Sequence, residues 1–563
     1  LGLFALNPTA YAEGAVADLI LHGAKVVTVD GDFSIRKAVA IRGDRIVAVG
    51  NDREIGKLAG PETLTIDLGG RTVIPGLIDS HIHALGYGLH ITEHVMFSTG
   101  ERLTVEAMLA KIAEHAARKP AGEWIYVRGP YSLDFVEEGR LPNRAELDIV
   151  APNNPLFINM QGHVGVVNSR AIALSGVSAD TPNPPNGIFV RDPASGELTG
   201  LLYEFPAFTP FLKDYPGYTL EEWLHAAASA EEVFNAYGLT SVVDLWTSKQ
   251  ELAVLTRLAN DGKLNVRWST VLKLAPEDYS DKSYEEVEQE LLQFWPVSPP
   301  DSDWLTVNGI KIIFDGFAEA AYMHDPYLQE KFGADWHGVA FWDQDTLLKV
   351  LNACARHDIQ AFVHVAGDAA LSTVLDAMKA VNEQTPIHGR RWTLEHASTM
   401  PSTEQLRLAQ EMEIVISTQQ AMGWSIGKTF KEFWGLDRGA VFAPNRTWLE
   451  ELGHPYLKAG SDNRPIDPFI GFWAYLARED VTGDVGRPDE ILSRADVLRL
   501  YTANGAYGIF EESDRGSIER GKLADLVVLS DDILTVPINE VRTIRPVMTM
   551  VGGRIKYHSD GNR

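Results

Sequence analysis

The pattern of hydrophobic and polar positions divides the chain into two kinds of sequence. Near both ends, short apolar runs alternate with Gly-containing turns, as in residues 38–50, where a Gly-Asp pair separates two runs. Two runs joined by such a turn are typical of a β-hairpin. The same pattern returns at 524–529 and 547–555. We therefore predict one small β-sandwich domain that both termini build together, from residues 16–73 and 515–563.

Between these ends, short apolar runs alternate with amphipathic helical stretches such as 220–237 and 369–382. This alternation is typical of βα units and a parallel sheet. Eight such runs predict an α/β fold, a (β/α)8 TIM barrel within residues 74–514, whose active site lies at the carboxyl ends of the strands. The predicted strands are the run that ends at His81, and residues 241–244, 266–271, 309–314, 361–364, 392–396, 414–417 and 456–462.

Residues 84–218 are too many for one crossover, so we predict a long insertion after the first barrel strand. Proline and glycine punctuate it, notably at 181–187, which predicts that much of it is loop. Long insertions on this side of a barrel usually cover the active site.

Composition narrows the class of protein. A chain of 563 residues with 45% hydrophobic and 23% charged residues is typical of a soluble globular protein. A net charge of −27 argues against nucleic acid or an anionic membrane as a partner. We expect a small-molecule substrate and, by default, a homodimer. The single cysteine, Cys354, excludes a disulfide framework and a thiolate metal cluster and fits a helix core.

Residues 1–15 have the composition of the end of a signal peptide. An apolar stretch, 1–6, is followed by Ala10-Tyr11-Ala12, which has the small-x-small form of a cleavage site. We predict export to the periplasm or the medium. The alternative is a frayed N-terminus on a cytoplasmic protein.

His81 and His83 close the first predicted strand. Residues two apart on a strand point to the same face, so both imidazoles can converge on a divalent metal such as zinc. Each candidate ligand taken alone could equally be a packed or ion-paired core residue. Their coincidence at one rim of the barrel indicates a metal site. The other polar residues at strand ends are Lys311 in the fourth strand, His364 in the fifth, His396 in the sixth and Asp462 in the eighth.

The motifs around these residues resemble the metal-dependent amidohydrolase superfamily, and within it the YtcJ-like branch, amidohydrolase family 3. The resemblance extends over nearly the whole chain after residue 16. It is carried by residues 76–83 (GLIDSHIH), 310–316 (IKIIFDG), 363–369 (VHVAGDA), 393–397 (TLEHA) and 460–462 (GSD), and, for the branch, by 141–148, 162–169, 502–506 and 521–528.

The resemblance implies a centre of two divalent metal ions, most often zinc. His81, His83 and Asp462 would hold one ion and His364 and His396 the other, with Lys311 bridging them as an N-carboxylated lysine. An ammonium group has no lone pair for a metal, whereas a carbamate offers two anionic oxygens. The alternative is a single metal, with Lys311 in a salt bridge.

Such a centre lowers the pKa of a bridging water and polarises a carbonyl group, and Asp462 would carry the proton to the leaving amine. We expect hydrolysis of a non-peptide C–N bond in an amide, formamide or cyclic amide. Hydrolysis of an ester, lactone or carbamate at the same centre is the main alternative. Deamination at a single metal would leave Lys311 without a role, and a non-catalytic relative would not need the intact ligand set.

Candidates for substrate contact are less specific. His163 and Asn168 could face the substrate from the insertion, and Arg464 could meet a carboxylate or carbonyl. Asp315 and Asp368 could each orient a ligand imidazole or cap the next helix, with capping favoured for Asp368. Aromatic residues on predicted rim loops could form apolar walls or belong to the core: Tyr131, Trp246 and Trp424.

Overall fold

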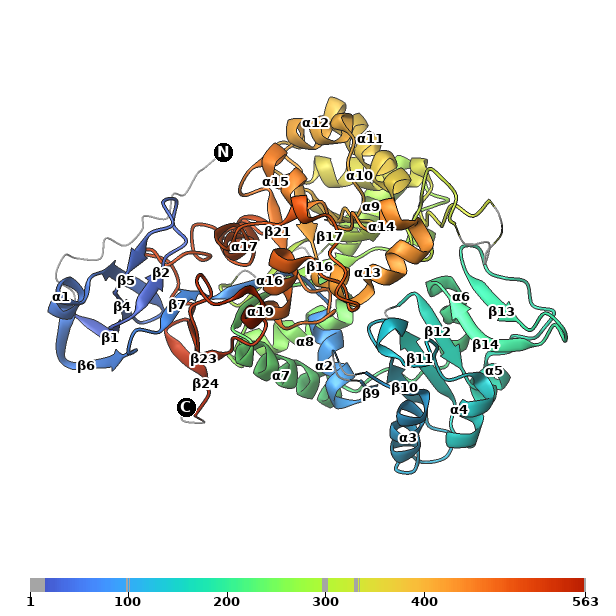
Figure 1. The fold of residues 1–563 in the computed structure, drawn as a ribbon. Helices are drawn as coiled ribbons and strands as arrows, with labels where there is room; N and C mark the ends of the chain where they lie inside the picture. The colour runs from blue at the N-terminus through green and yellow to red at the C-terminus, as the bar shows by residue number, and fades with distance from the viewer. Residues whose placement is uncertain are drawn as a thin grey trace.

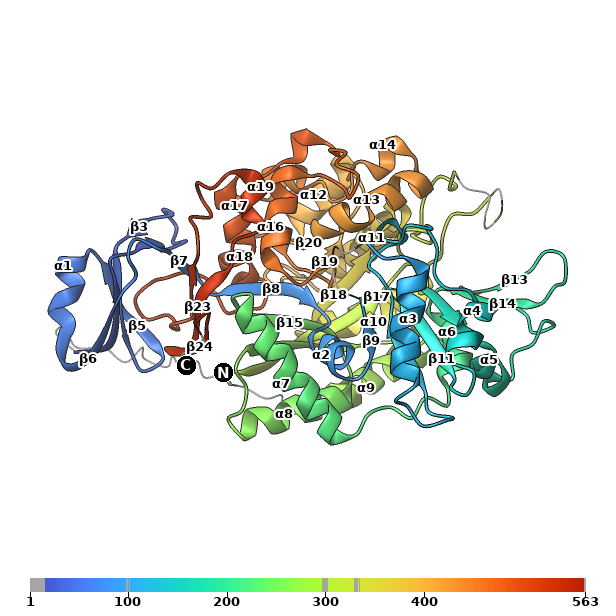
Figure 2. The same ribbon diagram turned by 60° about the horizontal axis from the view of Figure 1, so that its bottom comes forward.

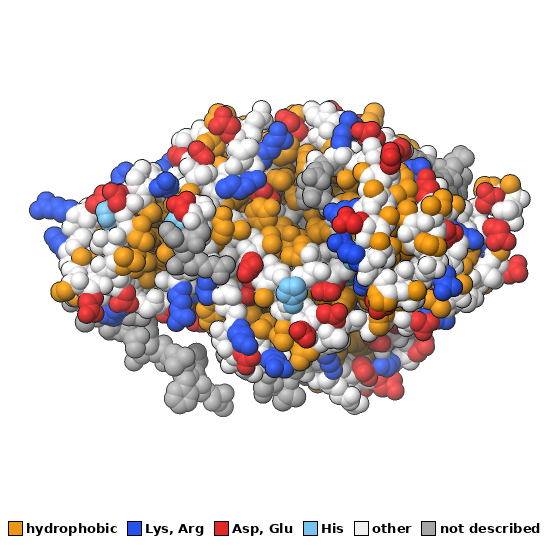
Figure 3. Space-filling model, turned by 90° about the horizontal axis from the view of Figure 1, so that it is seen from below, with side chains coloured by type: hydrophobic (Ala, Val, Ile, Leu, Met, Phe, Trp, Pro, Cys, Tyr) orange, Lys and Arg blue, Asp and Glu red, His pale blue; other side chains and the backbone are white. Residues whose placement is uncertain are grey.

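The computed structural model describes residues 16–97, 100, 102–160, 162–295, 302–328, 333 and 335–560. The predicted export signal at 1–15 lies outside these ranges and stays a prediction. Within them, no helix is both long and apolar enough to cross a bilayer. Seen from below, acidic and basic side chains are interspersed over the surface, and hydrophobic side chains gather in a hollow near the middle (Figure 3).

Eight parallel strands form a nearly closed barrel, which confirms the predicted (β/α)8 fold (Figure 2). The first and last strands meet where the backbone N–H groups of Ser461 and Asp462 donate to the carbonyl of His81. Helices cover the outer face, and this explains why the strands are apolar on both faces. The strands are β8 (Leu77–Ile82), β15 (Leu239–Thr247), β16 (Arg267–Lys273), β17 (Leu305–Ile313), β18 (Gln360–Val365), β19 (Thr393–His396), β20 (Val415–Thr418) and β21 (Leu457–Ala459).

The amphipathic helices begin at polar caps and turn their apolar stripe to the barrel. Thr219 and Glu222, for example, form a capping box at the start of α7. Cys354 lies fully buried in α10, as a core residue. The main helices of this layer are α2 (Ala84–Thr92), α7 (Leu220–Ala236), α8 (Lys249–Asn260), α9 (Tyr284–Phe294), α10 (Gln344–Arg356), α11 (Asp368–Gln384), α12 (Thr403–Glu411), α13 (Ala421–Trp434), α15 (Asn445–Leu452), α16 (Pro468–Ala477) and α17 (Arg494–Leu500).

The insertion is a folded lobe beside the barrel (Figure 1). Long connections lie between its elements, as the Pro and Gly positions predicted, but its sheet was not predicted. Its six strands lie in the order β13-β14-β12-β11-β10-β9 over their own apolar core, and the Pro-rich segment 181–187 only joins α5 to β13. The elements are β9 (Val95–Met96), α3 (Val105–Ala116), β10 (Ile125–Arg128), α4 (Arg144–Val150), β11 (Leu156–Met160), β12 (Val164–Val167), α5 (Ser169–Ser175), β13 (Ile188–Arg191), β14 (Leu198–Tyr203) and α6 (Phe205–Leu212).

Both termini build the predicted β-sandwich, in which a four-stranded sheet, β5-β4-β1-β6, packs on a six-stranded one, β24-β23-β22-β7-β2-β3. The ends of the chain join where β22 pairs antiparallel with β7. The strands are β1 (Ala17–His22), β2 (Lys25–Val27), β3 (Ile35–Arg36), β4 (Ala38–Arg42), β5 (Arg45–Gly50), β6 (Ala59–Asp67), β7 (Thr72–Pro75), β22 (Leu526–Leu529), β23 (Pro546–Val551) and β24 (Arg554–His558).

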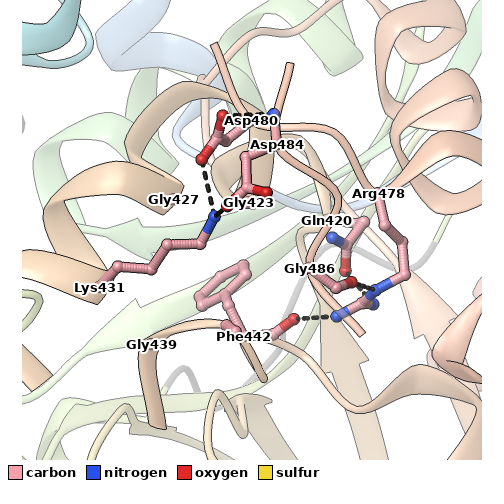
Figure 4. Close-up of a pocket in the computed structure, with 11 residues that line it drawn as sticks. Gln420, Gly423, Gly427, Lys431, Gly439, Phe442, Arg478, Asp480, Asp484 and Gly486 are labelled. Carbon is pink, nitrogen blue, oxygen red and sulfur yellow. Dashed lines mark hydrogen bonds and ion pairs between the residues drawn. The ribbon is translucent and has the colours of Figure 1, made fainter. Parts of the chain in front are cut away.

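The segment that follows β20 is tied down by a buried arginine. The guanidinium of Arg478 donates to Gln420 and to the carbonyl of Phe442 (Figure 4). It also donates to the carbonyls of Val441 and Ala443. Close by, Lys431 on α13 pairs with Asp480 at 2.9 Å. These contacts fix α13 against the loop that leads out of α16, on one side of the barrel mouth.

Candidate functional site

All six predicted metal ligands line one cavity of about 240 Å³ at the carboxyl ends of the barrel strands. His81 lies in β8 and His83 directly follows it; Asp462 lies in the turn after β21. The other three come from neighbouring strands: Lys311 from β17, His364 from β18 and His396 from β19.

His81, His83 and Asp462 form the tighter group. Asp462 Oδ1 lies 3.0 Å from His83 Nε2 and 3.6 Å from His81 Nε2. Ligand atoms of the three residues lie within 4.8 Å of one another, so one ion can contact them all. Asp462 reaches this position from a left-handed backbone conformation, φ 49°, which aspartate tolerates better than most residues.

His364 and His396 form a second pair, with ring centroids 4.5 Å apart. No third histidine, cysteine or carboxylate among the described residues completes a set of three with them. His364 Nε2 lies 3.2 Å from the carbonyl oxygen of Gly316 and 3.4 Å from Asp315 Oδ1, which leaves Nδ1 for a metal.

Lys311 lies beside both groups. Its side chain is buried, and Nζ has no hydrogen-bond partner in the described part of the chain. Burial lowers the pKa of Lys311 to about 8, although Glu395 and Asp462 oppose the change. A buried, unpartnered amine is costly, and near neutral pH a fraction of it is the uncharged, nucleophilic form.

The histidines are held in the neutral form that binds metal. Burial, and then the charge of Lys311, lowers the pKa of His81 to about 4. Burial also holds the pKa of His364 and of His396 well below the usual range. For Asp462 burial alone would raise the pKa, but Arg464 and the two nearby histidines outweigh it and keep the carboxylate ionised. Neutral imidazoles and a carboxylate, without a thiolate, fit zinc or a similar divalent ion.

Glu395 is a site residue that the sequence reasoning did not single out. Its Oε2 lies 2.5 Å from His81 Nδ1, so this carboxylate fixes the imidazole with Nε2 turned toward Asp462. Burial would raise its pKa, but His81 and Lys458 lower it to about 2. The available signal was a carboxylate at a fully buried position of a strand, directly before His396.

Three predicted substrate-facing residues line the cavity: His163, Arg464 and Trp246. His163 Nδ1 lies 2.9 Å from Glu204 Oε2, and its ring packs on Phe317. Arg464 Nε lies 3.4 Å from Asp462 Oδ2. Tyr131 is buried close enough to Arg464 to affect its pKa, but it is not among the lining residues.

The structure corrects the expectation of substrate contact at three positions. Asn168 is fully buried: its side chain caps α5 and bonds the backbone of Ala151, Asn154 and Leu156. Trp424 packs edge-on against Phe135 and Trp473.

Asp315 is the third residue at which the structure shows another role than substrate contact. It accepts N–H groups from Tyr322, Ala366 and Gly367 behind His364, which is the positioning alternative rather than substrate contact. Asp368 is the first residue of α11, where its carboxylate accepts the N–H of Ala369 and of His324.

The insertion supplies a wall that the sequence reasoning missed. Tyr126 and Arg128 on β10 and Asn159 on β11 line the cavity, with Phe205 from the start of α6. The sequence signal that could have revealed this wall is the alternation of apolar and polar residues at 125–128. Ile125 and Val127 belong to the core of the insertion. No strand was predicted within the insertion, so this alternation was not used.

Residues 64–557 match the amidohydrolase family. An N-substituted formamide deformylase of Arthrobacter pascens is 31% identical over 97% of this chain and 99% of its own length. YtcJ of Bacillus subtilis, whose name assigns it to the amidohydrolases, is 26% identical over 96% of this chain and 99% of its own length. An uncharacterized metal-dependent hydrolase of Pyrococcus horikoshii shares the fold, with a TM-score of 0.70 at 22% identity over 92% of this chain and 99% of that one. The chain belongs to the amidohydrolase family and is a metal-dependent amidohydrolase.

Proposed function

We propose that this enzyme hydrolyses the C–N bond of small N-substituted amides, formamides among them, at a centre of two zinc ions. The observation that carries the proposal is the convergence of four imidazoles, a carboxylate and an unpartnered lysine on one cavity. The similarity to a formamide deformylase over nearly the full length of both chains supports the bond type.

In this proposal His81, His83 and Asp462 hold one ion, and His364 and His396 hold the other. Lys311 supplies the shared ligand as an N-carboxylated lysine, formed when its neutral amine adds to carbon dioxide and loses a proton. Two observations support the modification: the second pair of histidines lacks a third donor, and Lys311 Nζ is buried without a partner.

The metal ions, when bound, would lower the pKa of the attacking water and polarise the substrate carbonyl. Asp462 would take a proton from this water and donate it to the amine nitrogen, since an amine leaves poorly unless it is protonated. Arg464 keeps Asp462 ionised before the reaction. His163, with Nδ1 donating to Glu204, keeps Nε2 for the N–H of the substrate amide.

Amine release from N-phenethylformamide by zinc-loaded protein tests the proposal. We expect turnover that is lost on chelation and restored by zinc, with about two ions per chain by elemental analysis. The ester of formic acid and phenethyl alcohol is the matched control. Hydrolysis of the ester without hydrolysis of the amide would support the ester alternative and contradict the proposal.

A further inference from the structure

One wall of the active-site cavity comes from the sheet of the insertion, across from the metal ligands. On β10, Ile125 and Val127 point into the core of the insertion, so Tyr126 and Arg128 point the opposite way, into the cavity. Asn159 lies beside Arg128 in the register of β10 and β11 and also lines the cavity. This wall therefore presents an aromatic ring and a guanidinium about 7 Å apart along one strand.

The charges that line the cavity are unbalanced. Asp462 is the only carboxylate side chain among its described lining residues, whereas Arg128 and Arg464 are both cationic. Arg464 is buried, and Arg128 lines the same space from the insertion. Partly desolvated like charges around one space are unfavourable, and an anion that enters the space relieves them.

Apolar side chains from the insertion and from the barrel complete the lining. Phe205, Phe317 and Trp246 line the same cavity. The guanidinium of Arg464 lies over the ring of Phe317, 5.1 Å from its centroid, so one cationic group is already oriented by an aromatic face. A ligand that fills this space has both an anionic group and an apolar or aromatic part.

We propose that the nitrogen substituent of the substrate carries a carboxylate and an apolar side chain, so that the substrate is an N-formyl or other short N-acyl amino acid, and that Arg128 binds the carboxylate. The inference rests on the proposed C–N hydrolysis. Bidentate pairing makes arginine suited to this role, whereas a carboxylate bound to the metals would not depend on Arg128.

A matched substrate pair tests the assignment. N-formylphenylalanine, as separate enantiomers, and N-phenethylformamide differ only in the carboxylate. We expect kcat/KM to be about 100-fold higher for one enantiomer of the acid than for the neutral amide. Arg128→Gln should raise KM for the acid and so remove most of this preference. It should change kcat/KM for the neutral amide by no more than about threefold. Arg140→Gln, which changes a solvent-facing arginine paired with Glu146 in the same insertion, is the control.

Equal or better turnover of the neutral amide by the unaltered enzyme would overturn the inference and leave the proposed function intact. If neither compound is hydrolysed, the proposed function fails for formamides. The role of Arg128 is then tested by measuring the affinity for a carboxylate ligand. Titration calorimetry with 3-phenylpropionate should then show at least tenfold weaker binding to Arg128→Gln than to the unaltered holoenzyme. Equal affinity for both proteins would overturn the role of Arg128.

Discussion

The barrel mouth and the insertion sheet face the same cavity but are built in different ways. In the mouth, each ligand side chain leaves the end of a strand that is buried on both faces, and Asp462 is fixed by the same backbone bonds that join β8 to β21. In the insertion, Tyr126 and Arg128 leave one face of β10 while the other face packs on a separate core. The metal site therefore depends on barrel closure, and the opposite wall does not.

This difference indicates that the barrel mouth determines turnover and the insertion wall determines substrate preference. A change at the mouth disturbs several ligands at once, because His81 contacts Glu395 and Asp462 directly. A change at Arg128 leaves intact the apolar face of its strand, with Ile125 and Val127. We therefore expect substitutions at the mouth to abolish turnover and substitutions in the wall to redistribute it among substrates.

The largest effect is expected at Asp462. Asp462→Asn keeps an oxygen donor but removes the base, so kcat for amine release should fall about 1,000-fold or more while the thermal unfolding temperature changes little. Steady-state kinetics and thermal unfolding of the same samples would check both parts. Near-normal kcat in this variant would refute the proton transfer by Asp462.

The second-largest effect is expected at Lys311. Lys311→Ala should lower the activity by about 100-fold and leave fewer than about 1.5 ions per chain. The loss removes the shared ligand, so short carboxylic acids such as propionate should restore part of the activity. Lys431→Ala is the matched control, because Lys431 pairs with Asp480 away from the ligands. Full metal occupancy in Lys311→Ala would count against the bridging role.

The metal ligands at the barrel mouth could be predicted because each of them interrupts or ends an apolar run of the sequence. A histidine or lysine in or at the end of such a run stands out, as in His81, His364 and Lys311, and the barrel topology then places these ends on one rim. The sequence pattern could not show which residues support the ligands. Glu395 stands next to His396, but its contact with His81 joins residues 314 positions apart.

The insertion was harder to predict because its strands are short and differ in pattern. β11 and β12 are buried on nearly every position, whereas β10 alternates over only four residues. Pairings within the sheet are both parallel and antiparallel, which short runs cannot indicate. Asn168 was misassigned for the same reason: without the start of α5 at Ser169, its role as a cap was not visible.

A smaller effect is expected at Glu395. Glu395→Gln should weaken metal binding at least tenfold, because the neutral amide holds His81 less firmly. In metal-free protein the pKa of this group falls from 4.5 to about 2 on folding. Its stabilisation is therefore complete above pH 4.5 and is lost as the pH falls toward 2. Urea unfolding should show Glu395→Gln less stable than the unaltered protein at pH 7, with the difference shrinking below pH 4.5. A pH-independent difference would contradict the ionised Glu395 carboxylate.

The smallest effect on activity is expected at Asn168, and it separates the fold of the insertion from its wall. Asn168→Ala removes the cap of α5 and leaves backbone groups unpaired, so the free energy of unfolding should fall by about 1–2 kcal/mol. Metal content and KM should not change, because the side chain points away from the cavity. Arg128→Gln should do the reverse, changing KM for the acidic substrate with little loss of stability. If Asn168→Ala instead shifts KM as Arg128→Gln does, the two faces of the insertion are coupled, and the wall is not independent of the packing beneath it.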